Sequence, residues 1–256
     1  MTTRLRTRAL TLTLLGVAAL STFIALALTG RAPGGWRLRT LFFTPAELAE
    51  RTRSEHRRER LEAFEGEALT PGGVLFIGSS TIEYFDLTEA FPAANAINRG
   101  IGDEDLDGLE RRLQATVERT RCKALVLYAG SVDFRRLARP AEDVASHVER
   151  LLERLGSAGR APYVVLLGIL PEREMSPAMT ERLRGTNRAL AALASRRPEV
   201  SFVDTARPPL VDPGTGCLEE LYSRDAVHLN ERGYGVASGW IAEADDRVRV
   251  LLHPAR

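Results

Sequence analysis

Cysteine is scarce in this 256-residue chain, and neither sign of charge dominates. Cys122 and Cys217 are the only cysteines, too few for a disulfide framework or for a zinc site built on thiolates, and they form no C-x-x-C redox pair. The sequence leaves undecided whether these two cysteines form a single disulfide bond with each other. Lysine and arginine total 35 against 34 aspartate and glutamate residues, a balance that provides no electrostatic attraction for nucleic acid. The chain is therefore predicted to be neither a thiol redox protein nor a nucleic-acid binder.

Signals for bound cofactors and metals are equally sparse. Residues 98–103 contain two glycines but lack the third glycine of a dinucleotide-binding motif. Residues 103–108 match the first half of a calcium loop, but Gln114 stands at the twelfth position, where a bidentate glutamate is needed. We expect these acids to lie at a helix N-terminus instead. Three histidines fall where solvated surface positions are expected: His56, His147 and His253. No cofactor and no metal site are predicted.

An uncharged stretch near the N-terminus predicts a membrane segment. Residues 9–28 contain no charged side chain and follow three arginines, and a helix of this length spans the hydrocarbon core of a bilayer. We predict that residues 1–30 form a transmembrane anchor with the N-terminus in the cytoplasm and the rest of the chain outside it. The alternative is a secreted protein, released by signal-peptide cleavage after residues 25–27, Ala-Leu-Ala.

Residues 31–70 are predicted to be a linker followed by a juxtamembrane helix. Residues 44–47, Thr-Pro-Ala-Glu, combine an N-cap, a proline suited to the first helical position and a capping-box glutamate. The helix should run to about residue 65. Arginines between residues 51 and 60 are interleaved with glutamates, which is typical of a solvated helix face rather than of a nucleic-acid patch.

The segment 71–256 alternates short apolar runs with longer amphipathic stretches and is predicted to be one domain. The apolar runs predict strands at residues 74–77, 96–98, 124–128, 163–167 and 201–203. The amphipathic stretches predict helices at residues 106–119, 141–155, 179–195 and 231–248. Strands that are apolar throughout are buried on both faces, so we expect an α/β fold with a mainly parallel five-stranded sheet between two layers of helices.

Residues able to do nucleophilic and acid–base chemistry follow these runs, where the active sites of such folds lie. Ser80 belongs to a Gly-Ser-Ser-Thr sequence after the first run, so its hydroxyl and nearby N–H groups can face a substrate. Asp225 precedes His228 by three residues on a loop, a spacing that lets the carboxylate hold Nδ1–H and leaves Nε2 as a base. Each motif alone is a common turn or cap. Their combination carries the functional signal.

Taken in order, four motifs resemble those of the SGNH/GDSL hydrolase family. They are Gly-Ser-Ser at 78–80, Asn-Arg-Gly-Ile-Gly at 98–102, Ala-Gly-Ser-Val-Asp at 129–133 and Asp-Ala-Val-His at 225–228. The resemblance extends from about residue 73 to residue 234. It implies a flavodoxin-like three-layer α/β/α sandwich, and it implies that Ser80, His228 and Asp225 are the catalytic residues of a serine esterase without a cofactor.

The resemblance also implies an oxyanion hole, with one departure. The backbone N–H groups of Ser80 and Gly102 would bind the oxyanion, and Gly100 is the alternative to Gly102. Where the family has an asparagine that donates its side-chain amide, this chain has Val132, which cannot donate. Loss of one such donor typically lowers turnover by a factor of about 100 to 1,000. Two polar side chains are candidate replacements for the missing donor: Ser131 and Asn98.

These implications predict an enzyme that cleaves an acyl ester of a small molecule, a glycan or a lipid. The substitution at Val132 leaves two alternatives open. One is a non-catalytic glycan- or lipid-binding protein that keeps the fold, and the other is an O-acyltransferase that passes the acyl group to a sugar hydroxyl. The sequence does not predict the acyl group, the alcohol or the oligomeric state.

Overall fold

The computed structural model describes residues 17–26, 43–157 and 162–254. The chain forms two compact units, residues 1–58 and 59–256. Residues 17–26 are helical, but half of the uncharged stretch at residues 9–28, and residues 31–42 of the predicted linker, lie outside the described residues. No helix within the described residues is both long enough and apolar enough to cross a membrane. The transmembrane anchor therefore stays a prediction.

The helix predicted after the linker is present as α3 (Pro45–Gly66). Its first turn contains the predicted capping box. The Glu47 carboxylate accepts a hydrogen bond from the Thr44 N–H at 2.7 Å, and the Glu47 N–H donates to the Thr44 hydroxyl at 3.3 Å. This reciprocal pair satisfies N–H groups that have no intrahelical acceptor, which explains why the helix begins here.

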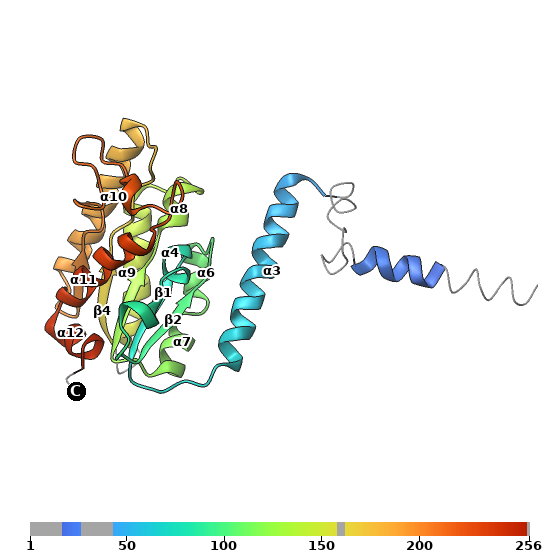
Figure 1. Cartoon of the computed structure of the whole chain (residues 1–256), viewed down its shortest axis with the longest axis horizontal. Helices are drawn as coiled ribbons and strands as arrows, with labels where there is room; N and C mark the ends of the chain where they lie inside the picture. The colour runs from blue at the N-terminus through green and yellow to red at the C-terminus, as the bar shows by residue number, and fades with distance from the viewer. Residues whose placement is uncertain (1–16, 27–42, 158–161, 255–256) are drawn as a thin grey trace, which may run out of the picture. The chain divides into compact units, whose positions relative to one another are not determined.

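Five parallel strands form the sheet of the second unit, in the order β2-β1-β3-β4-β5 (Figure 1). The strands are β1 (Val74–Gly78), β2 (Ala96–Gly100), β3 (Ala124–Tyr128), β4 (Tyr163–Leu167) and β5 (Val200–Val203). Gly78 pairs with both Gly100 and Tyr128, so β1, β2 and β3 end level at one edge of the sheet. The loops after these strands therefore meet at that edge. The predicted strands and their parallel arrangement are confirmed.

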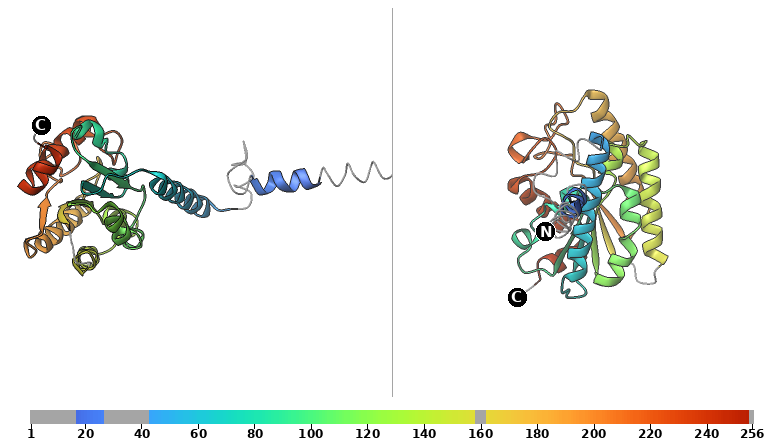
Figure 2. Two further views of the ribbon diagram at one scale, coloured as in Figure 1. Left: turned by 90° about the horizontal axis from the view of Figure 1, so that it is seen from below. Right: turned by 90° about the vertical axis from the view of Figure 1, so that its right-hand side faces the viewer.

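Helices cover both faces of the sheet (Figure 2). One layer consists of α6 (Leu106–Glu110), α7 (Leu113–Thr120), α9 (Ala141–Ser157) and α10 (Pro177–Ser195). The other consists of α4 (Ser80–Glu83), α5 (Leu87–Ala90), α11 (Glu231–Glu243) and α12 (Asp246–Leu252). Two predicted helices are each divided: the one at residues 106–119 forms α6 and α7, and the one at residues 231–248 forms α11 and the first part of α12. The second division arises because the Asp245 carboxylate accepts the Arg247 N–H at 2.8 Å and so caps a new helix.

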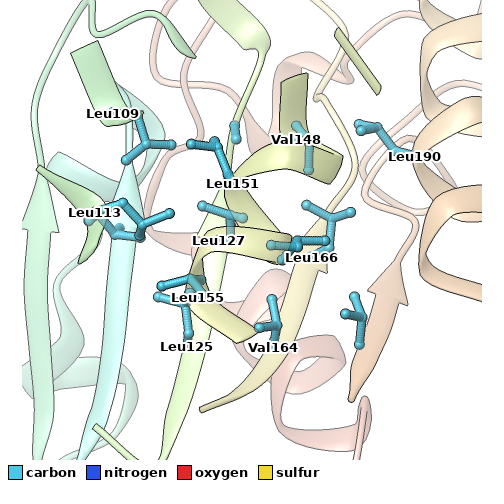
Figure 3. Close-up of a cluster of buried hydrophobic side chains, with 14 of the residues drawn as sticks. Leu109, Leu113, Leu125, Leu127, Val148, Leu151, Leu155, Val164, Leu166 and Leu190 are labelled. Carbon is cyan, nitrogen blue, oxygen red and sulfur yellow. The ribbon is translucent and has the colours of Figure 1, made fainter. Parts of the chain in front are cut away.

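The strands are buried on both faces because successive side chains enter opposite layers. Leu125 and Leu127 of β3 belong to the cluster that includes the α9 and α10 side chains, whereas Val126 and Tyr128 belong to the cluster on the α11 and α12 side. Figure 3 shows the first cluster, in which Leu151 of α9 lies over Leu127. Burial of such apolar surface is the main stabilising contribution to the fold. The three-layer α/β architecture predicted from the sequence is confirmed.

Both cysteines are free thiols, so the disulfide left open by the sequence is not present. Burial raises the pKa of the Cys122 thiol to about 11, which keeps it protonated and unreactive.

Candidate active site

Ser80 lies at the carboxyl edge of the sheet, directly after β1. Gly78 ends that strand with a φ of 154°, and a Cβ there would lie 2.2 Å from the carbonyl oxygen of Tyr128, so glycine is required for the chain to turn. Ser79 is extended, and Ser80 is the first residue of α4, where its N–H has no intrahelical acceptor. The backbone therefore presents a hydroxyl group and a polar N–H group at the same point.

His228 lies on the loop that leads into α11, and Asp225 shapes this loop. The Asp225 carboxylate accepts hydrogen bonds from the N–H groups of Val227 at 2.8 Å and His228 at 2.9 Å, which bends the backbone into an Asx turn. Asn230 then caps α11 by accepting the Gly233 N–H at 3.0 Å. The Asp225 carboxylate also lies 2.9 Å from Nδ1 of His228, so one side chain both bends the loop and orients the imidazole.

The structure joins Ser80, His228 and Asp225 in one hydrogen-bonded chain. Nε2 of His228 lies 2.9 Å from the Ser80 hydroxyl oxygen, although 148 positions separate the two residues in the sequence. An imidazole that directs Nδ1–H at a carboxylate has its lone pair on Nε2, where it can accept a hydroxyl proton. Burial raises the pKa of Asp225, but hydrogen bonds from His228 and from backbone N–H groups outweigh this effect and lower the pKa to about 2. The carboxylate is therefore ionised at neutral pH and can stabilise an imidazolium.

Two tyrosines support the positions of the serine and the histidine. The Tyr84 ring meets the His228 ring nearly edge-on, with centroids 5.0 Å apart and an interplanar angle of 80°. The Tyr234 hydroxyl donates to the Thr81 carbonyl at 2.8 Å and ties α11 to α4. Tyr234 also stacks on Phe85, with ring centroids 4.7 Å apart. Neither tyrosine was predicted, because no sequence motif distinguishes them from the other aromatic residues of the chain.

The N–H of Gly102, expected to be an oxyanion donor, is already engaged. It donates a hydrogen bond to the Glu83 carboxylate, which lies at the end of α4. Glu83 in turn lies 3.8 Å from the Arg60 guanidinium near the end of α3. Gly102 can therefore donate to an oxyanion only when Glu83 releases its N–H. No sequence motif connects these residues, so this contact was not foreseen.

Gly100, the alternative donor, serves to bring two backbones together. Its N–H donates to the Asn98 side chain at 2.8 Å. A Cβ at this position would lie 2.1 Å from the backbone nitrogen of Glu83. Glycine thus lets β2 pack directly against α4, the helix that begins with Ser80.

We expect Gly100→Ala to lower the free energy of unfolding by about 3 kcal/mol, because the new methyl group must push α4 away from β2. Urea unfolding of the variant and the wild type measures the loss. Gly239→Ala in α11 is the matched control, since a Cβ there meets no atom within 4 Å, and it should be neutral or stabilising by up to about 1 kcal/mol. Equal stability of Gly100→Ala and the wild type would mean that this close packing is unimportant.

Val132 is buried in α8 (Ser131–Arg135), and both candidate replacements for the missing donor have hydrogen-bond partners of their own. The Ser131 hydroxyl lies 2.9 Å from the hydroxyl of Ser79. The Asn98 amide donates to two carbonyl oxygens at and just beyond the end of α4, at 2.7 and 3.1 Å. Both side chains hold structural elements together. The replacement of the asparagine amide by one of them stays a prediction.

The acids that resembled half a calcium loop have other partners. The Asp105 carboxylate caps α6 by accepting the Gly108 N–H at 2.8 Å, which confirms the expected place at a helix N-terminus. Asp103 pairs with the guanidinium of Arg136 at 3.1 Å. Its backbone is left-handed, with a φ of 61°, a conformation that aspartate tolerates better than most side chains.

His147 is buried rather than solvated, so its predicted surface position is wrong. Its Nε2 lies 3.0 Å from Glu110, and its Nδ1 lies 3.4 Å from the Arg139 guanidinium. Ligand atoms of Asp107, Glu110 and His147 lie within 4.8 Å of one another, a grouping hidden in the sequence because it joins α6 to α9. Arg139 donates to Asp107 at 2.6 Å, and Arg154 pairs with Glu110. These arginines supply the positive charge that a metal ion would otherwise bring.

Comparison with known proteins gives a consistent set of relatives. A sequence profile of the GDSL-like Lipase/Acylhydrolase family matches residues 82–236. Human platelet-activating factor acetylhydrolase IB subunit alpha1 is 26% identical over 166 residues, 63% of this chain and 70% of that protein. A solved structure from Streptococcus pneumoniae, assigned as a platelet activating factor, has a TM-score of 0.69 at 24% identity and covers 77% of this chain and 96% of that one. The structure of an acetylxylan esterase from Geobacillus stearothermophilus has a TM-score of 0.53 at 13% identity, and the match covers 69% of this chain and 96% of that one.

The solved structures are below 25% identity and therefore establish the shared fold. The family profile matches more than half of the chain and spans both Asp225 and His228, while Ser80 lies just before its first matched residue. This chain belongs to the GDSL-like lipase/acylhydrolase family.

Proposed function

We propose that the chain is a serine esterase that hydrolyses an acyl ester through Ser80, His228 and Asp225. The observation that carries the proposal is the 2.9 Å distance between Nε2 of His228 and the Ser80 hydroxyl oxygen. In this mechanism the Ser80 oxygen attacks the ester carbonyl while His228 takes its proton and then returns it to the leaving alcohol. Water, deprotonated by the same imidazole, cleaves the acyl-serine and restores the hydroxyl. Asp225 orients the ring and stabilises the imidazolium.

Oxyanion stabilisation is the weaker part of the proposed site. The Ser80 N–H at the start of α4 supplies one donor. The Gly102 N–H supplies a second once Glu83 has moved away from it. The third donor is missing at Val132, so we expect turnover roughly 100 to 1,000 times lower than with an asparagine in that place.

Val132→Asn is accordingly expected to raise kcat on a small activated acetyl ester about a hundredfold, because the new amide would donate to the developing negative charge. Initial rates with p-nitrophenyl acetate measure the effect. Val132→Ala is the control for volume alone, and it should give no gain. An asparagine variant that folds normally but is no faster than the wild type would show that the oxyanion does not form beside residue 132.

Acetyl esters are the first substrates to test, since the names of two relatives specify acetyl groups: an acetylhydrolase and an acetylxylan esterase. Release of acid from short- and long-chain acyl esters by the full chain, with Ser80→Ala beside it, tests the proposed function. Absence of any release that depends on Ser80 would contradict it.

Non-catalytic binding of an acylated glycan or lipid is the second candidate, and two observations favour it. Val132 cannot donate a hydrogen bond, and the Gly102 N–H is engaged by Glu83. The serine–histidine hydrogen bond counts against it, because a binding protein has no need of an activated hydroxyl. An O-acyltransferase would use the same nucleophile, and product analysis with a sugar acceptor distinguishes it from an esterase.

We also propose that residues 9–28 anchor the chain in a membrane with the esterase domain outside the cytoplasm. The support is the uncharged stretch and the three arginines before it. The full chain should remain with the membrane fraction after alkaline carbonate extraction. Release into the supernatant would contradict the anchor and favour a cleaved signal peptide.

A further inference from the structure

A cavity of about 460 Å³ lies beside the proposed active site, between α5 and the first turns of α11. Tyr84 belongs to both places: its ring contacts His228, with centroids 5.0 Å apart, and it also lines the cavity. Phe85 and Tyr234 provide further aromatic surface, and Tyr234 is bonded to the helix that carries Ser80. A group bound in this cavity can therefore contact Tyr84, whose ring contacts His228, the proposed general base.

Acidic side chains dominate the charge of this cavity. Asp86, Glu89 and Glu231 line it, against one arginine, Arg224. Glu89 and Glu231 approach each other from α5 and α11, and the hydrogen bond and charge repulsion between them raise the pKa of Glu89. Among the described residues, no arginine or lysine forms an ion pair with either glutamate, although arginines pair with acids at many other places on this domain. The two carboxyl groups thus form an acidic site that no arginine or lysine of the described residues pairs with.

Aromatic faces combined with carboxylates favour a cation, and alkylammonium groups in particular are bound by such surroundings. One cation of the chain already lies beside this aromatic surface, because the Arg224 guanidinium carbon is 5.0 Å from the Tyr84 ring centroid. Arg224 is exposed, and among the described residues it forms no ion pair with Glu89 or Glu231. A substrate cation can therefore contact the aromatic rings and the glutamates together.

We propose that this cavity binds a cationic, alkylammonium-type group of the ester substrate. This inference rests on the proposed esterase function and adds the chemical class of the substrate to it. The cavity selects the substrate by charge, while Ser80, His228 and Asp225 act on the ester bond.

Two esters of the same shape test the selection. Acetylcholine and 3,3-dimethylbutyl acetate differ in one atom of the alcohol, a charged nitrogen in place of a neutral carbon. The full chain should hydrolyse the cationic ester with a kcat/KM about ten times higher, in a reaction that Ser80→Ala abolishes. The double variant Glu89→Gln/Glu231→Gln should bring the ratio close to 1. Glu243→Gln, an exposed position near the other end of α11, is the matched control and should keep the ratio.

A binding measurement separates this inference from the esterase proposal. The chain has five tyrosines, so ring-labelled tyrosine NMR of the full chain resolves few signals. Tetramethylammonium chloride should shift Tyr84 and Tyr234, and sodium chloride at equal ionic strength should not. Shifts without hydrolysis of either ester would refute the esterase and keep the cation site. Ser80-dependent hydrolysis with no preference between the esters, or no specific tyrosine shift, would overturn the inference and leave the esterase intact.

Discussion

Ser80→Ala is expected to abolish covalent labelling of the full chain by a fluorophosphonate probe and to lower ester hydrolysis at least about a thousandfold. Such probes react with a serine whose proton is taken by a neighbouring base. Among the hydroxyl groups of the described residues, only that of Ser80 is hydrogen-bonded to the His228 imidazole, with its oxygen 2.9 Å from Nε2. In-gel fluorescence measures the labelling, and initial rates with p-nitrophenyl acetate measure the hydrolysis.

Ser79→Ala is the matched control because the two serines are adjacent and both buried. The Ser79 hydroxyl bonds to Ser131 at 2.9 Å and has no hydrogen bond to the imidazole. Its loss should cost about 1 kcal/mol of stability and leave the labelling in place. Equal labelling of Ser80→Ala and the wild type would remove Ser80 from the mechanism, and loss of labelling in Ser79→Ala alone would transfer the role to Ser79.

Asp225→Asn should have the second large effect, a decrease in kcat of about ten thousandfold. The asparagine oxygen can still accept the two backbone N–H groups that form the turn, so the loop should keep its shape. Its amide, however, would face Nδ1 as a donor and favour the tautomer with the proton on Nε2. That tautomer cannot take the proton of Ser80. Initial rates of acetyl ester hydrolysis measure the decrease in kcat, and circular dichroism verifies that the variant is folded.

Asp212→Asn provides a control for removing a loop carboxylate. Asp212 also accepts a backbone N–H within a turn, that of Thr215 at 2.6 Å, but it lines no part of the proposed site. Hydrolysis should be unchanged in this variant. An Asp225→Asn enzyme within tenfold of the wild type would show that the carboxylate does not control the imidazole tautomer.

The strands and most helices were predictable because each depends on a local pattern. Runs such as residues 124–128 and 163–167 are apolar without interruption, and this property identifies strands buried on both faces. The capping box at the start of α3 is likewise encoded within four residues. The division between α6 and α7 was missed because residues 106–119 keep a helical pattern across the break.

The proposed site was predictable in a more limited way. Ser80, Asp225 and His228 were predicted because their motifs, taken in order with two others, resemble those of a known hydrolase family, and the aspartate–histidine contact is local. The engagement of Gly102 by Glu83, the commitments of Ser131 and Asn98, and the cavity behind Tyr84 were not found. Each of these depends on side chains that approach from different elements, and no spacing in the sequence records such contacts.

Sequence alone was sufficient for the alternation of strands and helices, the family motifs and the loss of an amide donor at residue 132, because these are properties of residue type and local order. The folded domain decided the rest. Strands β1 and β2 end level at one edge, so Glu83 after β1 reaches the N–H of Gly102 after β2. The loop before α11 brings Nε2 of His228 to 2.9 Å from the Ser80 hydroxyl oxygen. Distances between residues far apart in the chain are set by the packing of layers, so they appear only when the tertiary structure is complete.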